Sequence, residues 1–166
     1  MNTTRRLLLL GCATTVLLAG CGFQLRGSAS LPFESIFVST VPGSSFGNEL
    51  KRNLRAGTST RVVDEARLAQ AQFDLVAEGR NKEILSLNSA GRVLEYVLRY
   101  AVTFRVHDTK GKDFISNTII NLKREVSFNE SAILASESEE ALMFRDMQSD
   151  VVQQILRRMA AVKLPS

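Results

Sequence analysis

The chain has 166 residues, of which 45% are hydrophobic and 23% charged, and its formal net charge is +4. These proportions are ordinary for a globular protein, so they exclude disordered and fibrous classes, and the length is that of one domain. Two cysteines and one histidine are too few for a Cys/His zinc cluster, which needs about four ligands. A histidine-based catalytic site would have to use His107.

The N-terminal segment is typical of a secretion signal. Arg5 and Arg6 form a basic start, and a mostly apolar run of 13 residues follows from Leu7 to Ala19. A stable membrane span needs about 20 residues, so this run is too short to remain in the bilayer. We therefore expect residues 1–20 to be a signal peptide that is removed on export.

The end of the apolar run resembles a bacterial lipobox. Leu18-Ala19-Gly20-Cys21 matches the motif in which a cysteine thiolate is alkylated by a diacylglyceryl group, cleavage follows before the cysteine, and the new amine is acylated. Since two anchoring signals already hold a protein stably on a membrane, three acyl chains on Cys21 would make detachment negligible. In such lipoproteins the absence of Asp after the cysteine, where this chain has Gly22, indicates delivery to the outer membrane. An ordinary signal peptide with an accidental cysteine is the alternative.

Cleavage before Cys21 gives the expected domain organisation. A lipidated tether over 21–30 would lead into a single α+β domain over 31–166, without an internal repeat or a long linker. Cys12 would leave with the signal peptide and Cys21 would become a thioether. No disulfide is therefore expected, although the periplasm is oxidising.

The first half of the domain predicts short elements. A strand is expected over Ser35–Ser39. Phe46, Leu50 and Leu54 then recur every four residues, which predicts a short amphipathic helix ending at Gly57. The next segments are predicted as a brief strand over Arg61–Val63 and a helical turn or loop over Glu65–Gln72.

The centre of the chain predicts three long strands. From Leu94 to Val106 every even position is apolar or aromatic and most odd positions are polar, which indicates a strand with one buried face. Apolar residues at alternate positions also mark Phe73–Leu87 and Phe114–Phe128, and the intervening segments 88–91 and 108–113 contain glycine. Successive strands joined by such short turns predict an antiparallel meander.

A long helix is expected at the C-terminus. Ser136 and Glu139 form a capping-box signature, and apolar residues at helical spacing continue from Phe144 to Val162, before Pro165. The predicted fold class is α+β, with two helices packed on one face of a mainly antiparallel sheet that has long meander strands.

No residue pattern predicts catalysis. Phosphate-binding, dinucleotide-binding, zinc-protease and nucleophile-elbow motifs are all absent from the sequence. His107 ends the long strand beside Asp108, where a solvated imidazole is the favoured interpretation and a general base the alternative. Acidic residues in the first turn of the last helix suit the helix dipole, with calcium binding as the weaker alternative. We expect no enzyme, no metal, and no cofactor beyond the lipid on Cys21.

Charge is distributed unevenly along the chain. The segment from Lys51 to Arg124 carries +6, and the segment from Glu125 to Asp150 carries −6. Nucleic acid is not expected outside the cytoplasm, whereas lipopolysaccharide in the outer envelope has phosphates that suit Lys and Arg donors. A solvated, salt-bridged sheet face is the alternative. The candidate lipopolysaccharide-binding residues are Arg80, Lys82, Arg92, Arg99, Arg105, Lys123 and Arg124.

A string of short motifs resembles one family. The motifs are Cys21-Gly22-Phe23-Gln24-Leu25-Arg26-Gly27, Leu31-Pro32, Glu95-Tyr96 and Ile155-Leu156-Arg157-Arg158. In order and spacing they resemble the LPS-assembly lipoprotein family (LptE, formerly RlpB), and the resemblance covers essentially all of the chain after the signal peptide. It implies a fold of two helices on a four-stranded sheet.

The resemblance implies a partner rather than a reaction. Family members occupy the lumen of the large outer-membrane β-barrel that inserts lipopolysaccharide into the outer leaflet, as plug, assembly aid and ligand-binding surface. We therefore expect a lipid-anchored, periplasm-facing protein of the outer membrane. Where members can carry basic residues near the first hairpin tip and before the last helix, this chain has Ser89 and Ser136, and Arg92 is the expected substitute near the tip. The alternative is a generic envelope lipoprotein that scaffolds or carries amphiphiles without a barrel partner.

Overall fold

The computed structural model describes residues 30–128 and 133–163, with the backbone alone described for 133–136. The predicted signal peptide, Cys21 and all of the tether except Ser30 lie outside the described residues. The elements are β1 (Ser35–Ser39), α2 (Ser45–Gly57), β2 (Arg61–Val63), the 3₁₀ turn η1 (Ala66–Leu68), β3 (Ala71–Leu87), β4 (Val93–His107), β5 (Asp113–Ser127) and α3 (Ile133–Ala160).

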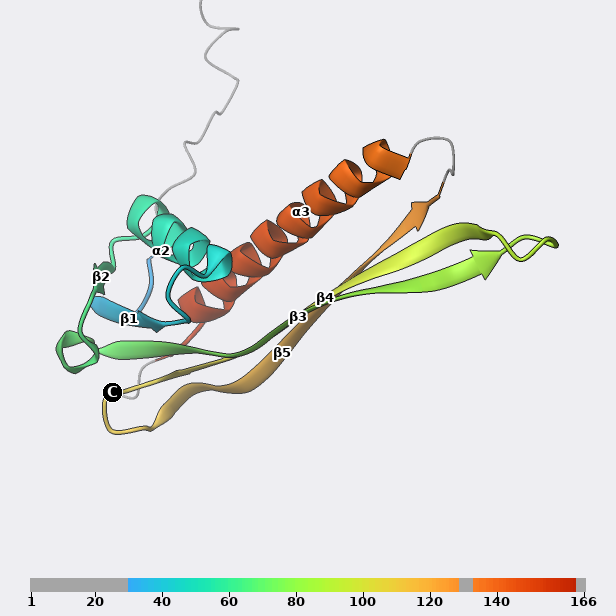
Figure 1. Ribbon diagram of the computed structural model, residues 1–166. Helices are drawn as coiled ribbons and strands as arrows, with labels where there is room; N and C mark the ends of the chain where they lie inside the picture. Colours follow the sequence, from blue (N-terminus) through green and yellow to red (C-terminus); the bar gives the residue numbers. More distant parts are fainter. Residues whose placement is uncertain (1–29, 129–132, 164–166) are drawn as a thin grey trace, which may run out of the picture.

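The strands form one mixed sheet with the order β2-β1-β3-β4-β5 (Figure 1). Strand β1 runs parallel to both β2 and β3, while β3, β4 and β5 form the antiparallel meander. The expected four-stranded, mainly antiparallel sheet is therefore wrong in its strand number and in half of its pairings. The reason is that α2 serves as a crossover, which lets the brief strand β2 return parallel to β1.

Helix α2 confirms the helix predicted from the apolar spacing. The Ser44 hydroxyl accepts a hydrogen bond from the backbone N–H of Gly47 at 3.1 Å, which satisfies one free donor of the first turn. Phe46, Leu50 and Leu54 are fully buried against the sheet. The backbone N–H of Thr58 donates to the Leu54 carbonyl at 3.2 Å and closes the last turn.

The two meander turns share one construction. Asn88 accepts backbone N–H bonds from residues 90 and 92 through its side chain, and Asp108 accepts them from residues 110 and 112. Gly91 and Gly111 take positive φ angles of 75° and 83°, which residues with a Cβ adopt only with strain. Both turns, and the three long strands to within two residues at each end, confirm the predicted meander.

Both helices lie on one face of the sheet, and the opposite face has no covering layer in the described part of the chain (Figure 1). The core packs the rings of Phe46, Phe73 and Phe104 against one another, with centroid distances of 6.4 and 5.6 Å. On β4 the even positions from Leu98 to Val106 are buried, as predicted. Leu94 is 46% exposed because the β3–β4 hairpin extends beyond the helical layer.

A bulge in β3 changes which side chains face the helices. Leu75 pairs with Phe104, but the next pair is Ala77 with Thr103, so Val76 is an extra residue. A one-residue shift moves every later side chain to the other face. The apolar alternation predicted over Phe73–Leu87, in which Ala77 continues the pattern of Phe73 and Leu75, is therefore wrong beyond Leu75.

Helix α3 begins at Ile133, three residues before Ser136. The predicted capping box is therefore wrong, because Ser136 lies inside the first turns of the helix rather than before them. Helix-forming residues at 133–135 allow this earlier start. Among the helices in the described ranges, none combines the length and the hydropathy needed to cross a bilayer.

Candidate binding surfaces

The seven candidate cations do not form one surface. Cross-strand partners share a sheet face, so Arg80 opposite Tyr100, and Lys82 and Arg124 in register with Leu98, lie on the helix-covered face. By the same register, three candidates lie on the open face and one follows the β3–β4 turn. These are Arg99, Arg105 and Lys123 on the open face, and Arg92 after the turn.

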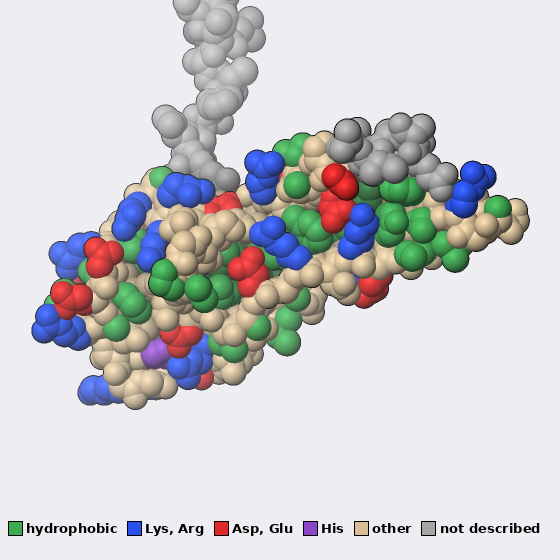
Figure 2. Space-filling model, in the orientation of Figure 1, with side chains coloured by type: hydrophobic (Ala, Val, Ile, Leu, Met, Phe, Trp, Pro, Cys, Tyr) green, Lys and Arg blue, Asp and Glu red, His purple; other side chains and the backbone are tan. Residues whose placement is uncertain are grey.

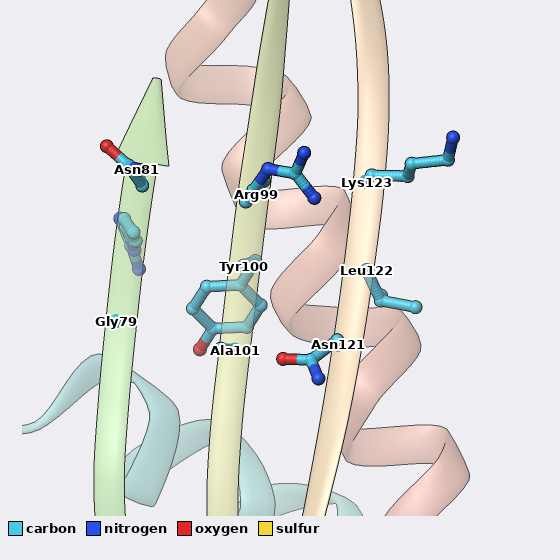
Figure 3. A pocket seen from close by; sticks show the side chains of 9 residues that line it. Gly79, Asn81, Arg99, Tyr100, Ala101, Asn121, Leu122 and Lys123 are labelled. Carbon is cyan, nitrogen blue, oxygen red and sulfur yellow. The ribbon is translucent and has the colours of Figure 1, made fainter. Parts of the chain in front are cut away.

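The open face carries a shallow depression. Its volume is about 670 Å³, and residues 79–81, 99–101 and 121–123 of the three meander strands line it. Figure 3 shows the depression from the open face, with α3 behind the sheet. Asn81 of β3, Arg99 of β4 and Lys123 of β5 lie on neighbouring strands. Gly79 and Ala101 carry little or no side chain, so the depression is open and shallow rather than an enclosed site.

On the helix-covered face, Arg80 and Lys82 join β3 to α3. The Arg80 guanidinium lies 5.5 Å from the Tyr100 ring centroid and 5.7 Å from that of Phe144, and Nη2 donates to Gln148 Oε1 at 2.9 Å. The Lys82 ammonium lies 4.2 Å from the Tyr96 ring centroid. Such stacked cations contribute to packing as well as to charge.

A buried polar network lies between the two helices. Gln148 is 4% exposed, its Oε1 accepts from the Ser45 hydroxyl as well as from Arg80, and its Nε2 donates to Glu49 Oε2 at 2.6 Å. Ser149 donates to the other Glu49 oxygen at 2.6 Å. The sequence contained a usable indication of this network, because Gln148 interrupts the apolar stripe of α3.

Tyr100 is a buried ionisable side chain in the region where Arg80 connects β3 to α3. It is fully buried, and its hydroxyl donates to Glu78 Oε1 at 2.8 Å. Burial, followed by the hydrogen bond to the Glu78 carboxylate, raises the pKa of Tyr100 well above its usual range. The neutral phenol is thus the form this site holds.

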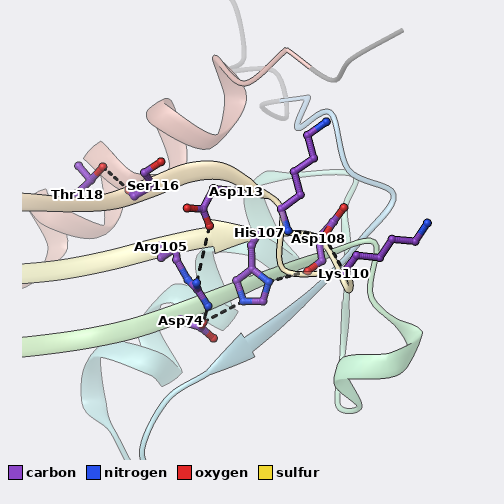
Figure 4. Close-up of polar contacts among 9 residues, drawn as sticks. Asp74, Arg105, His107, Asp108, Lys110, Asp113, Ser116 and Thr118 are labelled. Atoms are coloured by element: carbon purple, nitrogen blue, oxygen red, sulfur yellow. Dashed lines mark hydrogen bonds and ion pairs between the residues drawn. The ribbon is translucent and has the colours of Figure 1, made fainter.

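His107 is not the solvated imidazole that we expected. It is 7% exposed, with Nε2 3.0 Å from Asp74 Oδ2 and Nδ1 2.6 Å from the Asp108 carbonyl oxygen (Figure 4). Arg105 Nη2 also donates to Asp74 Oδ2 at 3.0 Å. The burial has a simple cause: strand pairing brings these side chains together at the end of the meander. Both ring nitrogens contact oxygen atoms of the protein, so this cluster has a structural role and connects β3 to β4. Within the described ranges, no group of three or more His, Cys, Asp and Glu side chains is placed to hold a metal ion.

Six candidate cations have a carboxylate within 4.0 Å. The pairs are Arg80–Glu78 at 3.7 Å, Lys82–Glu140 at 2.6 Å, Arg99–Glu83 at 3.1 Å, Arg105–Asp74 at 3.0 Å, Lys123–Glu125 at 3.8 Å and Arg124–Asp150 at 3.0 Å. Three of these pairs join the basic segment to the acidic one, and two of the three, Lys82–Glu140 and Arg124–Asp150, link residues far apart in the sequence. An anionic ligand at any of the six must therefore compete with a carboxylate already in place.

A long antiparallel meander, covered by helices on one face and open on the other within the described residues, defines the class as an α+β protein with one free sheet face. The chain matches the family model LptE, described as lipopolysaccharide-assembly, over residues 33–159, and so it belongs to the LptE family. This membership confirms the predicted function class, which is lipopolysaccharide assembly by a non-enzymatic lipoprotein of the outer membrane.

Individual relatives agree with the family assignment. The chain is 30% identical, over 159 residues, to the LPS-assembly lipoprotein LptE of Yersinia enterocolitica, covering 94% of this chain and 75% of that protein. An uncharacterized lipoprotein B from Nitrosomonas europaea has 38% identity and a TM-score of 0.74, covering 84% of this chain and 91% of that one. The rare lipoprotein B of Shewanella oneidensis shares the fold, with 23% identity and a TM-score of 0.68 over 76% of this chain and 94% of that one.

Proposed function

We propose that this chain is the luminal subunit of the lipopolysaccharide translocon. It is held at the outer membrane by acyl chains on Cys21, faces the periplasm, and places its meander inside a large outer-membrane β-barrel. The length of the meander supports this: β3 has 17 residues, which extend over about 55 Å at 3.3 Å per residue. The apolar band of an outer-membrane barrel is about 25 Å tall, so the strands are long enough to reach through it.

The far half of the β3–β4 hairpin carries this proposal. Beyond Asp74, and within the described residues, β3 pairs with β4 alone. Large apolar side chains are exposed there, namely Ile84 at 57%, Leu85 at 47%, Leu87 at 53% and Leu94 at 46%. Several large apolar side chains exposed along one hairpin favour an interaction surface there. The hairpin is therefore built to be covered by a partner.

The open face suits the wall of such a barrel. Its Arg, Asn and Thr side chains, among them Asn81, Thr103 and Asn121, are donors and acceptors for hydrogen bonds. The interior of an outer-membrane barrel is polar, so the open face meets a wall of matching chemistry. The helix-covered face supplies the stiffness that keeps three long strands together.

Cross-linking tests the hairpin contact. A photo-reactive residue replacing Leu85, near the hairpin tip, should yield a covalent product with one large outer-membrane protein in intact cells. The same group replacing Arg67, whose side chain is 80% exposed on η1 at the other end, is the matched control and should give much less of that product. Equal products from both positions, or none from Leu85, would contradict insertion of the hairpin.

Lipopolysaccharide binding is the second part of the proposal, at the seven candidate cations. Lys82 allows a sharp test, because Glu140 neutralises it at 2.6 Å. If Lys82 binds a phosphate, Lys82→Gln should weaken lipopolysaccharide binding several-fold, whereas Glu140→Gln should strengthen it by releasing the ammonium. Binding to purified protein, followed by fluorescence, measures both. If the affinity for lipopolysaccharide falls in both variants, or changes in neither, Lys82 contributes to packing and does not bind the phosphate.

Depletion separates the translocon subunit from a generic envelope lipoprotein. Loss of a translocon subunit should remove newly made lipopolysaccharide from the cell surface, which a surface-labelling assay detects. An unchanged surface after depletion would favour a carrier or scaffold without a barrel partner.

A further inference from the structure

The helical end of the molecule carries cations that the fold leaves uncompensated. Arg52 and Arg55 of α2 and Arg157 and Arg158 of α3 are exposed, and Lys51 is half-buried. Within the described residues none of these five has a carboxylate at ion-pair distance, whereas six cations of the meander do. Figure 2 shows Lys and Arg side chains gathered over α2. These five positive charges are therefore not neutralised by a carboxylate of the described residues.

Two hydrogen bonds join the helices that carry these cations. Ser149 bonds to Glu49 at 2.6 Å and Gln153 bonds to Asn53 at 3.0 Å, so α2 and α3 contact each other with the same chain direction. Both helices end on the side of the molecule away from the β3–β4 turn, although they diverge toward it (Figure 1). We call the surface formed by Lys51, Arg52, Arg55, Arg157 and Arg158 the basal cationic surface.

Acidic side chains near this surface offset only part of its charge. Glu49, the acidic residue of α2, has both oxygens hydrogen-bonded to α3. Asp150 of α3 is paired with Arg124, on the meander side. Glu34, Asp64 and Glu65, in the segments flanking β1 and β2, are the remaining carboxylates close to α2 in sequence, and Glu65 is paired with Arg67 at 2.6 Å. The basal cationic surface therefore keeps a net positive charge.

The start of the described chain lies at the same end. The Phe33 carbonyl accepts from the Thr60 hydroxyl at 2.8 Å, and the Glu34 carbonyl accepts from the Arg61 backbone at 3.0 Å, directly after α2 ends. The eight residues between Cys21 and Ser30 give nine Cα–Cα steps, which can span at most about 30 Å. If Cys21 is the lipid anchor, as the proposed function requires, the end of α2 cannot move far from the bilayer surface.

We propose that the basal cationic surface binds the anionic phospholipid headgroups of the bilayer in which Cys21 is anchored. Short tethering and charge complementarity both favour this occupant. Each Lys or Arg held near an anionic leaflet strengthens binding about fivefold, and the attraction falls off within a Debye length. The contact fixes the basal end at the membrane surface and leaves the β3–β4 hairpin free to enter its partner. This inference rests on the proposed anchor at Cys21.

A thiol-specific probe tests the contact on the whole, processed protein. Cys12 would leave with the signal peptide and Cys21 would be blocked by lipid, so Ala56→Cys on the exposed side of α2 adds one reactive thiol. The protein, labelled there with an environment-sensitive fluorophore, is reconstituted in phosphatidylcholine vesicles with or without about 30% phosphatidylglycerol. The anionic vesicles should shift the emission to the blue and lower quenching by a soluble quencher at least threefold.

Matched variants identify the charges responsible. Lys51→Gln/Arg52→Gln/Arg55→Gln keeps good helix formers and should abolish the response to phosphatidylglycerol. Arg99→Gln/Lys123→Gln, on the open face, should leave it intact, while salt at about 0.5 M should suppress it. A label that stays equally quenched in both vesicles, or a triple variant that still responds, overturns the inference.

The two proposals fail in different ways. Flotation with neutral vesicles reports the lipid anchor, because acyl chains insert without any need for anionic headgroups. Loss of flotation therefore contradicts the proposed anchor itself. Normal flotation without protection of the α2 label contradicts the basal contact alone.

Discussion

At the scale of single residues, Arg80 and Lys82 show how position changes the role of a cation. In the sequence they belong to a basic segment and are candidates for an anionic ligand. In the structure the Arg80 guanidinium lies over Tyr100 and Phe144, and Lys82 bonds to Glu140, which is 58 positions away. The sequence predicted the residue types but not these partners, because the pairing depends on where α3 lies across the sheet.

Tyr100 gives a prediction about pH. An unfolded chain ionises tyrosine near pH 10, whereas burial and Glu78 raise the pKa of Tyr100 in the folded protein. Above about pH 10 the unfolded state therefore loses a proton that the folded state keeps, and the free energy of unfolding should fall by about 1.4 kcal/mol per pH unit. Urea denaturation between pH 9 and about 11 measures this slope.

Tyr100→Phe provides the control for that slope. Phenylalanine keeps the ring under Arg80 but has no proton to lose. The decrease in the free energy of unfolding above about pH 10 should therefore be smaller by about 1.4 kcal/mol per pH unit. An identical slope in both proteins would show that Tyr100 ionises in the folded state.

At the scale of elements, the periodicity of apolar residues predicted the regular strands but not the bulge that interrupts β3. The structure confirmed the long half-buried strand β4, which alternating apolar residues had predicted, and both turns, which the Gly-containing segments had predicted. The bulge at Val76 has no equivalent signal, because an extra valine is compatible with either face. Yet that bulge turns Arg80 and Lys82 toward the helices. The brief strand over Arg61–Val63 was predicted and is confirmed, but three residues do not indicate whether a strand pairs parallel or antiparallel, so the mixed character of the sheet was not predicted.

The β4–β5 turn gives the prediction at this scale. Gly111 has φ of 83°, so Gly111→Ala should lower the free energy of unfolding by about 1 kcal/mol or more, although a Cβ there would meet no neighbour. Gly79→Ala is the matched control, since Gly79 has neither a positive φ nor a close neighbour. Urea denaturation compares the two. Equal effects at both positions would show that backbone strain is not what Gly111 relieves.

At the scale of the whole molecule, charge and shape divide the protein into two ends. The β3–β4 hairpin extends away from the helices, and six cations of the meander are paired with carboxylates, while the basal cationic surface keeps cations without such partners. The sequence predicted the imbalance between a basic and an acidic segment. It did not predict that folding joins the two segments through Lys82–Glu140 and Arg124–Asp150. The net charge of a sequence segment indicates the charge of a binding surface only when residues that pair with each other within the protein are left out of the sum.

Co-purification tests the central claim that this anchored domain works inside an outer-membrane barrel. The tagged, full-length protein is isolated from outer membranes solubilised in a mild detergent, and the composition of the complex is measured by quantitative mass spectrometry. We predict a single large β-barrel protein in a fixed molar ratio, which persists when the basal cations are changed and declines when the exposed leucines of the β3–β4 hairpin become polar. Recovery of the lipoprotein alone under these conditions would contradict the account.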